Sequence, residues 1–152
     1  MFSISEVDKY DSDLTWLVSE LDAFQSQLYP AESNHCLDLS TVTDKQLRCV
    51  IVRDESGSPV GCGALLLQEN GSAEIKRVYI RPEYRGRKLG EKIVTAIETM
   101  ASEKNSGILL LETGIHQQPA IALYRRCGYE TCDAFPPYAA DPLSVFMCKK
   151  LR

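Results

Sequence analysis

The chain has 152 residues, of which 44% are hydrophobic and 25% charged, with a formal net charge of -4. This composition is typical of a globular domain and excludes a fibrous or disordered chain. The length is that of one ordinary domain, so we expect a single domain over residues 1–152. The acidic balance argues against a dedicated nucleic-acid binder, which needs a cationic face, so we expect no nucleic-acid partner.

The six cysteines include no C-x-x-C pair, and His35 and His116 are the only histidines. A zinc cluster has little to build on, so we expect no metal. The N-terminal residues lack the basic-then-apolar pattern of a signal peptide, and no apolar run approaches the ~18 residues that span a bilayer. We therefore expect a cytoplasmic protein with reduced thiols and no membrane contact.

The first half of the chain reads as a strand, a helix and a meander. Residues 2–7 alternate apolar and polar side chains, and residues 14–28 carry apolar side chains at helical spacing after the capping segment 11–13. The polar segment 29–41 predicts a short second helix or a turn. Three further apolar segments, separated by turn residues, predict strands at 47–52, 60–68 and 73–80.

The second half alternates helices and strands. From Leu89 the apolar residues fall on one helical face as far as residue 101, and the continuous apolar run 108–111 is typical of a central strand. A short amphipathic helix around 120–124 and strands at 129–132 and 143–151 complete the order. We expect an α/β fold: a mixed sheet of about six or seven strands with helices on both faces.

The segment 74–90, EIKRVYIRPEYRGRKLG, runs from an apolar strand through a cationic loop into a helix N-terminus. The first N–H groups of a helix have no intrahelical partner, and the helix dipole adds partial positive charge there. Arg85, Arg87 and Lys88 add formal charge to the same loop. We expect this junction to hold the diphosphate of a nucleotide-like cofactor.

Two motifs carry a family resemblance. Residues 85–90, RGRKLG, match a loop in which Arg or Gln is followed by two residues, Gly, one residue, and Gly or Ala, with Lys88 where glycine is usual. Residues 117–129, QQPAIALYRRCGY, match Asn-x-x-Ala-Ile-x-Leu-Tyr-x-x-x-Gly-Phe, with Gln117 for Asn and Tyr129 for Phe. The chain thus resembles the GNAT superfamily of acetyl-CoA-dependent N-acetyltransferases.

The resemblance implies a GNAT-type, mostly antiparallel twisted sheet in which two parallel central strands splay apart. Acetyl-CoA is then the expected cosubstrate, with its pantetheine arm along the first splayed strand and its diphosphate in the cationic loop. The cofactor-binding residues that follow from the resemblance are Val78, Tyr79, Ile80, Arg85, Gly86, Arg87, Lys88, Leu89, Gly90, Gln117 and Tyr124.

Acetyl transfer to an amine needs a proton acceptor, a stabilised oxyanion and a proton donor for the departing thiolate. By resemblance Glu74 is the strand glutamate that acts as base, and Tyr124 is the helix tyrosine that acts as acid. A solvent-facing Glu74 at a hairpin end is the alternative interpretation. Glu112 is the rival carboxylate, as base or as a group that orients the substrate ammonium, and a backbone N–H near Val78 would stabilise the oxyanion.

We predict N-acetylation of a primary amine of a small molecule or an amino acid by direct attack. A protein lysine or N-terminal amine as acceptor, and a non-catalytic CoA-binding module, are the alternatives, and a homodimer stays open. The expected substrate-binding residues are Asn34, His35, Arg77, Glu112, His116 and Tyr138.

Overall fold

The computed structural model describes residues 1–28, 46–68, 70–135 and 138–151. The strands are β1 (Ser3–Val7), β2 (Leu47–Arg53), β3 (Pro59–Leu67), β4 (Ser72–Ile80), β5 (Ile108–Gly114), β6 (Glu130–Thr131) and β7 (Ser144–Lys150). The helices are α1 (Ser12–Leu28), α2 (Leu89–Glu103) and α3 (Gln118–Arg126), and a 3₁₀ turn, η3 (Pro82–Tyr84), precedes α2. The predicted order of the other elements is confirmed, and the segment 29–41, predicted as a short helix or a turn, lies outside the described residues.

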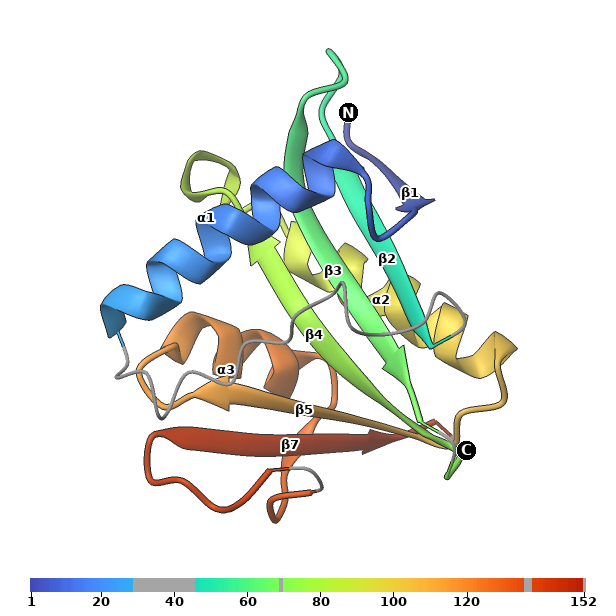
Figure 1. Ribbon diagram of the computed structural model, residues 1–152, viewed down its shortest axis with the longest axis vertical. Coiled ribbons are helices and arrows are strands. Elements are labelled where there is room, and N and C mark those ends of the chain that lie inside the picture. The colour runs from blue at the N-terminus through green and yellow to red at the C-terminus, as the bar shows by residue number, and fades with distance from the viewer. Residues whose placement is uncertain (29–45, 69, 136–137, 152) are drawn as a thin grey trace.

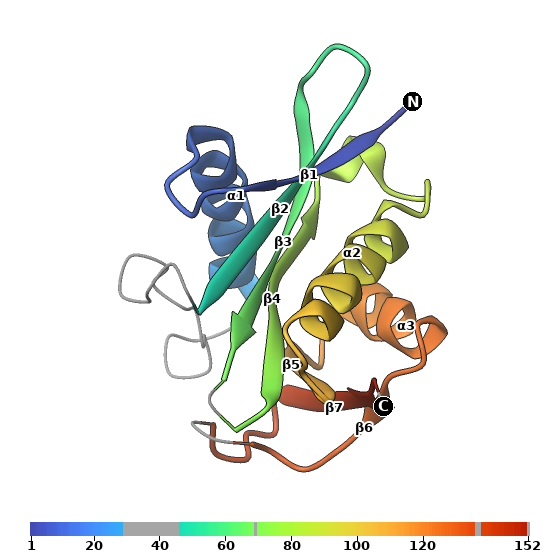
Figure 2. The same cartoon turned by 90° about the vertical axis from the view of Figure 1, so that its right-hand side faces the viewer.

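The strands form one sheet in the order β1-β2-β3-β4-β5-β7-β6. β4 and β5 are parallel, and every other pair in this sheet is antiparallel. Figures 1 and 2 show α1 on one face of the sheet and α2 and α3 on the other. The mixed, mostly antiparallel sheet with helices on both faces is therefore as predicted.

Helix α1 begins where Asp11 caps it. The Oδ1 atom of Asp11 accepts the N–H groups of Asp13 at 2.9 Å and Leu14 at 3.1 Å, two of the donors that a helix start leaves without partners. The buried stripe of α1, which includes Leu14 and Leu17, then packs on the face of the sheet that carries Tyr79. In the described part of the chain, no helix combines the length and the apolar character needed to cross a bilayer.

Helix α2 lies against β3 because a glycine leaves room for it. A Cβ atom at Gly63 would lie 2.5 Å from Ile93 Cγ2 and 3.0 Å from Ile97 Cδ1, both on the buried face of α2. Any larger residue would push the helix away from the sheet, since such contacts are shorter than van der Waals separation. Gly63 thus marks a close approach between α2 and the sheet.

A β-bulge interrupts β4 at Arg77. Cys62 pairs with Tyr79 and Ala64 with Lys76, so β4 carries one more residue than β3 across this step. Arg77 has φ 59°, in the left-handed region that non-glycine residues adopt only at a cost. A bulge bends its strand and shifts the alternation of side chains, which is why both Lys76 and Arg77 reach partners on the α1 face.

Beyond the first half of β4, the two parallel strands separate. Their pairing runs from Ser72 opposite Ile108 to Ile75 opposite Leu111 and stops there, although β4 continues to Ile80 and β5 to Gly114. Over the same stretch β4 stays paired with β3, and β5 stays paired with β7. Figure 1 shows the resulting V between the two strands, which confirms the predicted splay.

Tyr129, which stands where the second motif usually has phenylalanine, joins α2 to the sheet. Its ring is 2% exposed and its hydroxyl donates to Glu98 Oε2 at 2.9 Å. The same oxygen accepts the Lys149 ammonium of β7 at 3.0 Å. The extra hydroxyl therefore completes a charge-assisted contact that a phenylalanine could not make.

The substitution Tyr129→Phe should lower the free energy of unfolding by about 1.5 kcal/mol, the lower end for a hydrogen bond to a charged group, because Lys149 still neutralises Glu98. Denaturant unfolding measures this change. The matched control is Tyr10→Phe, since the Tyr10 side chain is 67% exposed, and it should leave stability unchanged. Equal stability of the two variants would show that the Tyr129 hydroxyl contributes nothing.

Candidate active site

A cleft of about 470 Å³ opens where β4 and β5 diverge. Its walls come from both sides of the sheet, with Leu21 and Phe24 of α1 on one side and Leu123 of α3 on the other. Of the predicted cofactor residues, all but Arg87 line it: Val78, Tyr79, Ile80, Arg85, Gly86, Lys88, Leu89, Gly90, Gln117 and Tyr124. The structure thus gathers two motifs that are separated in sequence around one opening.

The loop before α2 turns through two left-handed residues. Gly86 has φ 82°, and Lys88, at the N-cap of α2, has φ 61° and ψ 24°. Lysine reaches this conformation at a cost that glycine does not pay. The substitution in the family motif therefore keeps the backbone conformation that a glycine would allow, and it adds a cation to the lining of the cleft.

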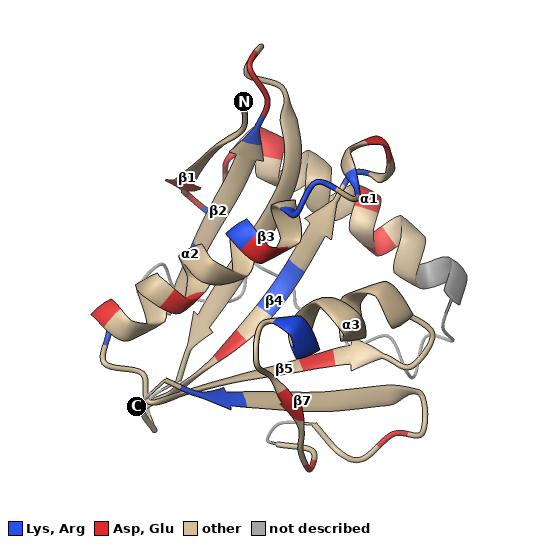
Figure 3. Cartoon of the chain, turned by 180° about the vertical axis from the view of Figure 1, so that it is seen from behind, with Lys and Arg blue, Asp and Glu red and all other residues tan. Residues whose placement is uncertain are grey.

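The backbone donors of this loop are available to a ligand. In the described part of the chain, the N–H groups of residues 86–91 donate to no other group of the protein. They stand at the start of α2, where the partial positive charge of the helix dipole is largest. Figure 3 shows lysines and arginines in the same loop, so an anion placed here meets both N–H donors and positive charge.

Helix α3 brings Tyr124 into the cleft. The side chain is 7% exposed and its ring packs edge-on against Tyr129 at 5.9 Å. Its hydroxyl makes no hydrogen bond with the described residues, which leaves it open to a ligand. Burial raises the pKa of Tyr124 above that of a free phenol, because the phenolate would be poorly solvated there.

Gln117 is oriented by the end of β5. Its Oε1 atom accepts the Thr113 hydroxyl at 2.9 Å and the Gly114 N–H at 3.1 Å. Because both partners donate, the amide nitrogen of Gln117 turns the other way. Glutamine thus serves at the position where the motif usually has asparagine.

Glu74 lies on the α1 face of the sheet, within the part of β4 that is still paired with β5. Its side chain is almost fully buried, and its Oε2 atom accepts Lys76 Nζ at 2.9 Å and the Tyr138 hydroxyl at 2.6 Å. Lys76 also donates to the Tyr138 oxygen. The interpretation of Glu74 as a solvent-facing residue is wrong, because Lys76 and Tyr138 enclose it.

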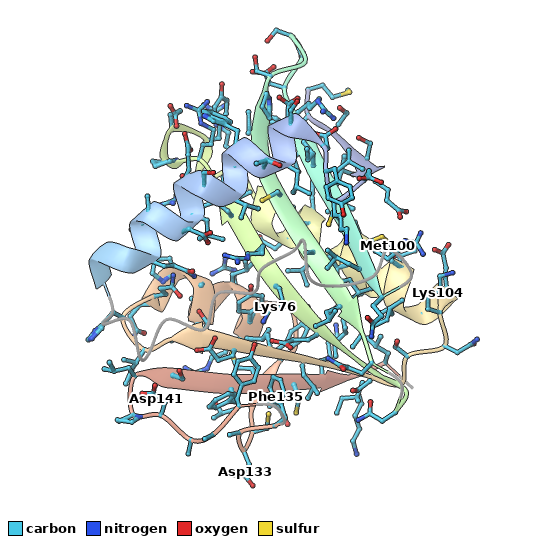
Figure 4. All side chains as sticks on the ribbon, in the orientation of Figure 1. Lys76, Met100, Lys104, Asp133, Phe135 and Asp141 are labelled. Atoms are coloured by element: carbon cyan, nitrogen blue, oxygen red, sulfur yellow. The ribbon has the colours of Figure 1, made fainter. Side chains whose placement is uncertain are left out.

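Lys76 contacts both Glu74 and Tyr138, although neither sequence motif includes it. Figure 4 shows it on the face of the sheet that α1 crosses, with Phe135 on the same side, over β7. The Tyr138 ring packs on Phe135 at 5.3 Å and on Phe146 at 5.8 Å. Burial, and then the negative charge of Glu74, raise the pKa of Tyr138 well above that of a free phenol, so it remains a hydrogen-bond donor.

Glu112 lies at the opening itself. It follows Leu111, the last β5 residue that pairs with β4, and it is paired with Phe146 of β7. The Ser144 hydroxyl donates to its Oε2 atom at 2.7 Å. Glu112 and Glu74 lie on the same face of the sheet, but Glu112 is the one placed where the strands part.

Of the other predicted substrate residues that the structure describes, His116 lines the cleft and Arg77 does not. Arg77 is 9% exposed and forms an ion pair with Asp22 of α1, which ties that helix to the bulge. His116 lines the same cleft as the cofactor loop. Asn34 and His35 lie outside the described residues. The α1 residues of the cleft wall belong to the predicted apolar stripe, but no sequence signal shows that part of this stripe faces a ligand.

A model of the acetyltransferase (GNAT) family matches residues 13–129 of the chain. The chain is also 45% identical to the IAA acetyltransferase of Azospirillum brasilense over 136 residues, and this alignment covers 89% of this chain and 88% of that protein. An uncharacterized N-acetyltransferase of Bacillus subtilis, YsnE, is 31% identical over 137 residues, 89% of this chain and 90% of that protein.

Solved structures agree with these relatives. A Klebsiella pneumoniae structure ascribed to an acyl-CoA N-acyltransferase superposes with a TM-score of 0.91 at 45% identity and covers 100% of this chain and 99% of that one. The PaiA N-acetyltransferase of Thermoplasma acidophilum, crystallised with coenzyme A, shares the fold with a TM-score of 0.75 at 16% identity over 99% of each chain. The chain is therefore an acyltransferase that belongs to the GNAT family of acetyltransferases.

Proposed function

We propose that the protein transfers the acetyl group of acetyl-CoA to a primary amine of a small molecule or an amino acid by direct attack. The observation that carries this proposal is the cleft at the divergence of β4 and β5, which joins the N–H donors of residues 86–91 to the Tyr124 hydroxyl. The 45% identity to a protein named IAA acetyltransferase supports the acetyl donor. A screen of amines with detection of free thiol tests the proposal, and no thiol release with any amine would contradict it.

The residues of the cleft fit acetyl-CoA. The N–H groups at the start of α2 suit its diphosphate. Beyond Ile75 the edge of β4 is no longer paired with β5, and this edge suits the amide groups of the pantetheine arm. Gly90 lets Leu123 of α3 pack closely on the start of α2 beside this path, because a Cβ there would lie 2.8 Å from Leu123 Cδ2. When bound, acetyl-CoA supplies an acyl group activated as a thioester.

Tyr124 is the proton donor in this proposal. Its raised pKa keeps the phenol protonated, and its hydroxyl has no partner among the described residues, so it can donate to the departing sulfur. A backbone N–H near Val78, just after the bulge at Arg77, stabilises the negative charge that develops on the carbonyl oxygen. Both groups line the same cleft.

A glutamate accepts the proton of the acceptor amine, since a Lys-like amine has a reference pKa of ~10.4 and is mostly ammonium near neutral pH. Glu112 is the better placed of the two candidates, since it stands where the strands part. Glu74 is enclosed by Lys76 and Tyr138, and its role is to hold these two side chains in place by hydrogen bonds.

The loop conformation gives a first prediction. Alanine at Gly86, with φ 82°, should strain the loop by about 1–2 kcal/mol, turn its N–H groups and weaken coenzyme A binding about tenfold. The matched control is Gly57→Ala, because Gly57 has φ 87° in the turn between β2 and β3, and a Cβ added there would have no other atom within 4 Å.

Isothermal titration with coenzyme A and thermal unfolding of both variants make the comparison. Both should be destabilised to a similar extent, and only Gly86→Ala should bind coenzyme A more weakly. Equal affinities in the two variants would remove this loop from the binding site.

Removal of the proton donor gives a second prediction. Tyr124→Phe should lower kcat about 10²–10⁴-fold and leave the affinity for coenzyme A unchanged. Tyr129→Phe is the control, since its ring touches Tyr124 but its hydroxyl binds Glu98. In the wild type, the raised pKa predicts no loss of kcat from ionisation of this phenol up to pH ~10, the ordinary phenol pKa. An unchanged kcat in Tyr124→Phe would rule out this role.

The two carboxylates give a third prediction. Glu112→Gln should lower kcat/KM for the amine about 10²-fold at neutral pH, because the acceptor can no longer lose its proton to this group. Glu74→Gln should chiefly lower stability, since it leaves the buried Lys76 ammonium without its anion. Steady-state kinetics and denaturant unfolding separate the two effects, and the reverse pattern would assign the base to Glu74.

A further inference from the structure

Arg87 lies inside the cofactor loop but does not line the cleft. Its guanidinium carbon is 5.9 Å from the centre of the Phe2 ring and 5.7 Å from the centre of the Tyr84 ring. These two rings meet edge to face, at 6.1 Å and 90°. The cation therefore sits against two aromatic faces, an arrangement that stabilises arginine without any anion.

The two rings are anchored to the core of the domain. Phe2, which directly precedes β1, and Tyr84, in the turn before the loop, both pack against the hydrophobic core under α2. The Tyr84 hydroxyl donates to Asp54 Oδ2 at 3.3 Å, and the same aspartate organises the turn between β2 and β3 through Ser56 and Ser58. Arg87 is thus connected to the N-terminal end of the chain and to that turn.

A second arginine holds the other side of the loop. Arg85 donates from Nε to the Ile80 carbonyl at 3.0 Å, and its guanidinium lies about 6 Å from the rings of Phe24 and Tyr79. Because the N–H groups of residues 86–91 bind nothing within the described protein, the loop is held by side-chain contacts of this kind together with the buried Leu89.

We propose that Arg87 and Phe2 are positioning residues for the cofactor loop: the Phe2–Arg87–Tyr84 stack holds the N–H groups of residues 86–91 in the arrangement that binds the diphosphate. This inference rests on the proposed acetyl-CoA site. In this proposal Arg87 does not contact the phosphate directly, and Phe2, near the N-terminus, contributes to the affinity for the cofactor through its contact with Arg87.

The test is a double-mutant cycle with Phe2→Leu and Arg87→Gln, read as the dissociation constant of coenzyme A by isothermal titration. Each single variant should bind about 3–5-fold more weakly, the size of one cation–π contact, and the double variant should bind about as weakly as either single one. Phe2→Tyr keeps a ring and should bind as the wild type does. Ile4→Ala on β1, 37% exposed, is the control for changes to this strand and should also bind normally.

Salt dependence separates positioning from phosphate contact. If Arg87 acts by stacking, Arg87→Gln keeps the wild-type slope of affinity against ionic strength, and if it touches phosphate the slope becomes shallower. Weak binding in Arg87→Gln with normal binding in Phe2→Leu would overturn the proposal, as would strictly additive effects. Failure of the wild type to bind coenzyme A would instead contradict the proposed function, and thermal unfolding without ligand shows that each variant is folded.

Discussion

The parallel pairing of β4 with β5 stops at Ile75 and Leu111, and the site exists because it stops there. Each strand keeps its other neighbour, so the sheet remains continuous at its edges while its centre opens. The bulge at Arg77 lies two residues beyond the last pair and bends β4 away. A central strand in the middle of a domain normally has both edges paired. Here β4 beyond Ile75 has no strand partner on its β5 side among the described residues, next to a helix N-terminus whose N–H groups donate to none of those residues.

Charge is used in two different ways around this opening. On the α2 side, backbone N–H groups face the cleft, and the arginines of the loop are held by aromatic rings and a carbonyl. On the α1 side, the ionised side chains are paired with one another, as in Lys76 with Glu74 and Arg77 with Asp22. A buried pair such as Lys76 with Glu74 costs desolvation energy, and loss of one partner is strongly destabilising, which suits groups that hold a fixed geometry.

Much of this architecture is readable from sequence. Periodicity places the helices and strands within a few residues, Asn70-Gly71 marks the hairpin between β3 and β4, and the two motifs locate the loop and Tyr124. Local patterns do this well because each depends on neighbours in the chain. The bulge escapes such reasoning, since Arg77 is not a residue type that signals a left-handed φ.

Contacts between distant segments also escape it. Strand alternation puts Lys76 on the same face as Glu74, but no sequence pattern places either residue beside Tyr138, which is more than 60 residues away in the chain. Charge alone predicts that Arg87 faces the cofactor, whereas the two rings that it contacts come from the N-terminal residues and from the turn before the loop.

The most direct test of the account is amide hydrogen exchange by NMR with and without coenzyme A. Binding should slow exchange in β4 from Val78 to Ile80 and in residues 86–91, with no change at 72–75. Unchanged exchange in β4 while coenzyme A is bound would contradict the central claim that the open strand edge holds the cofactor.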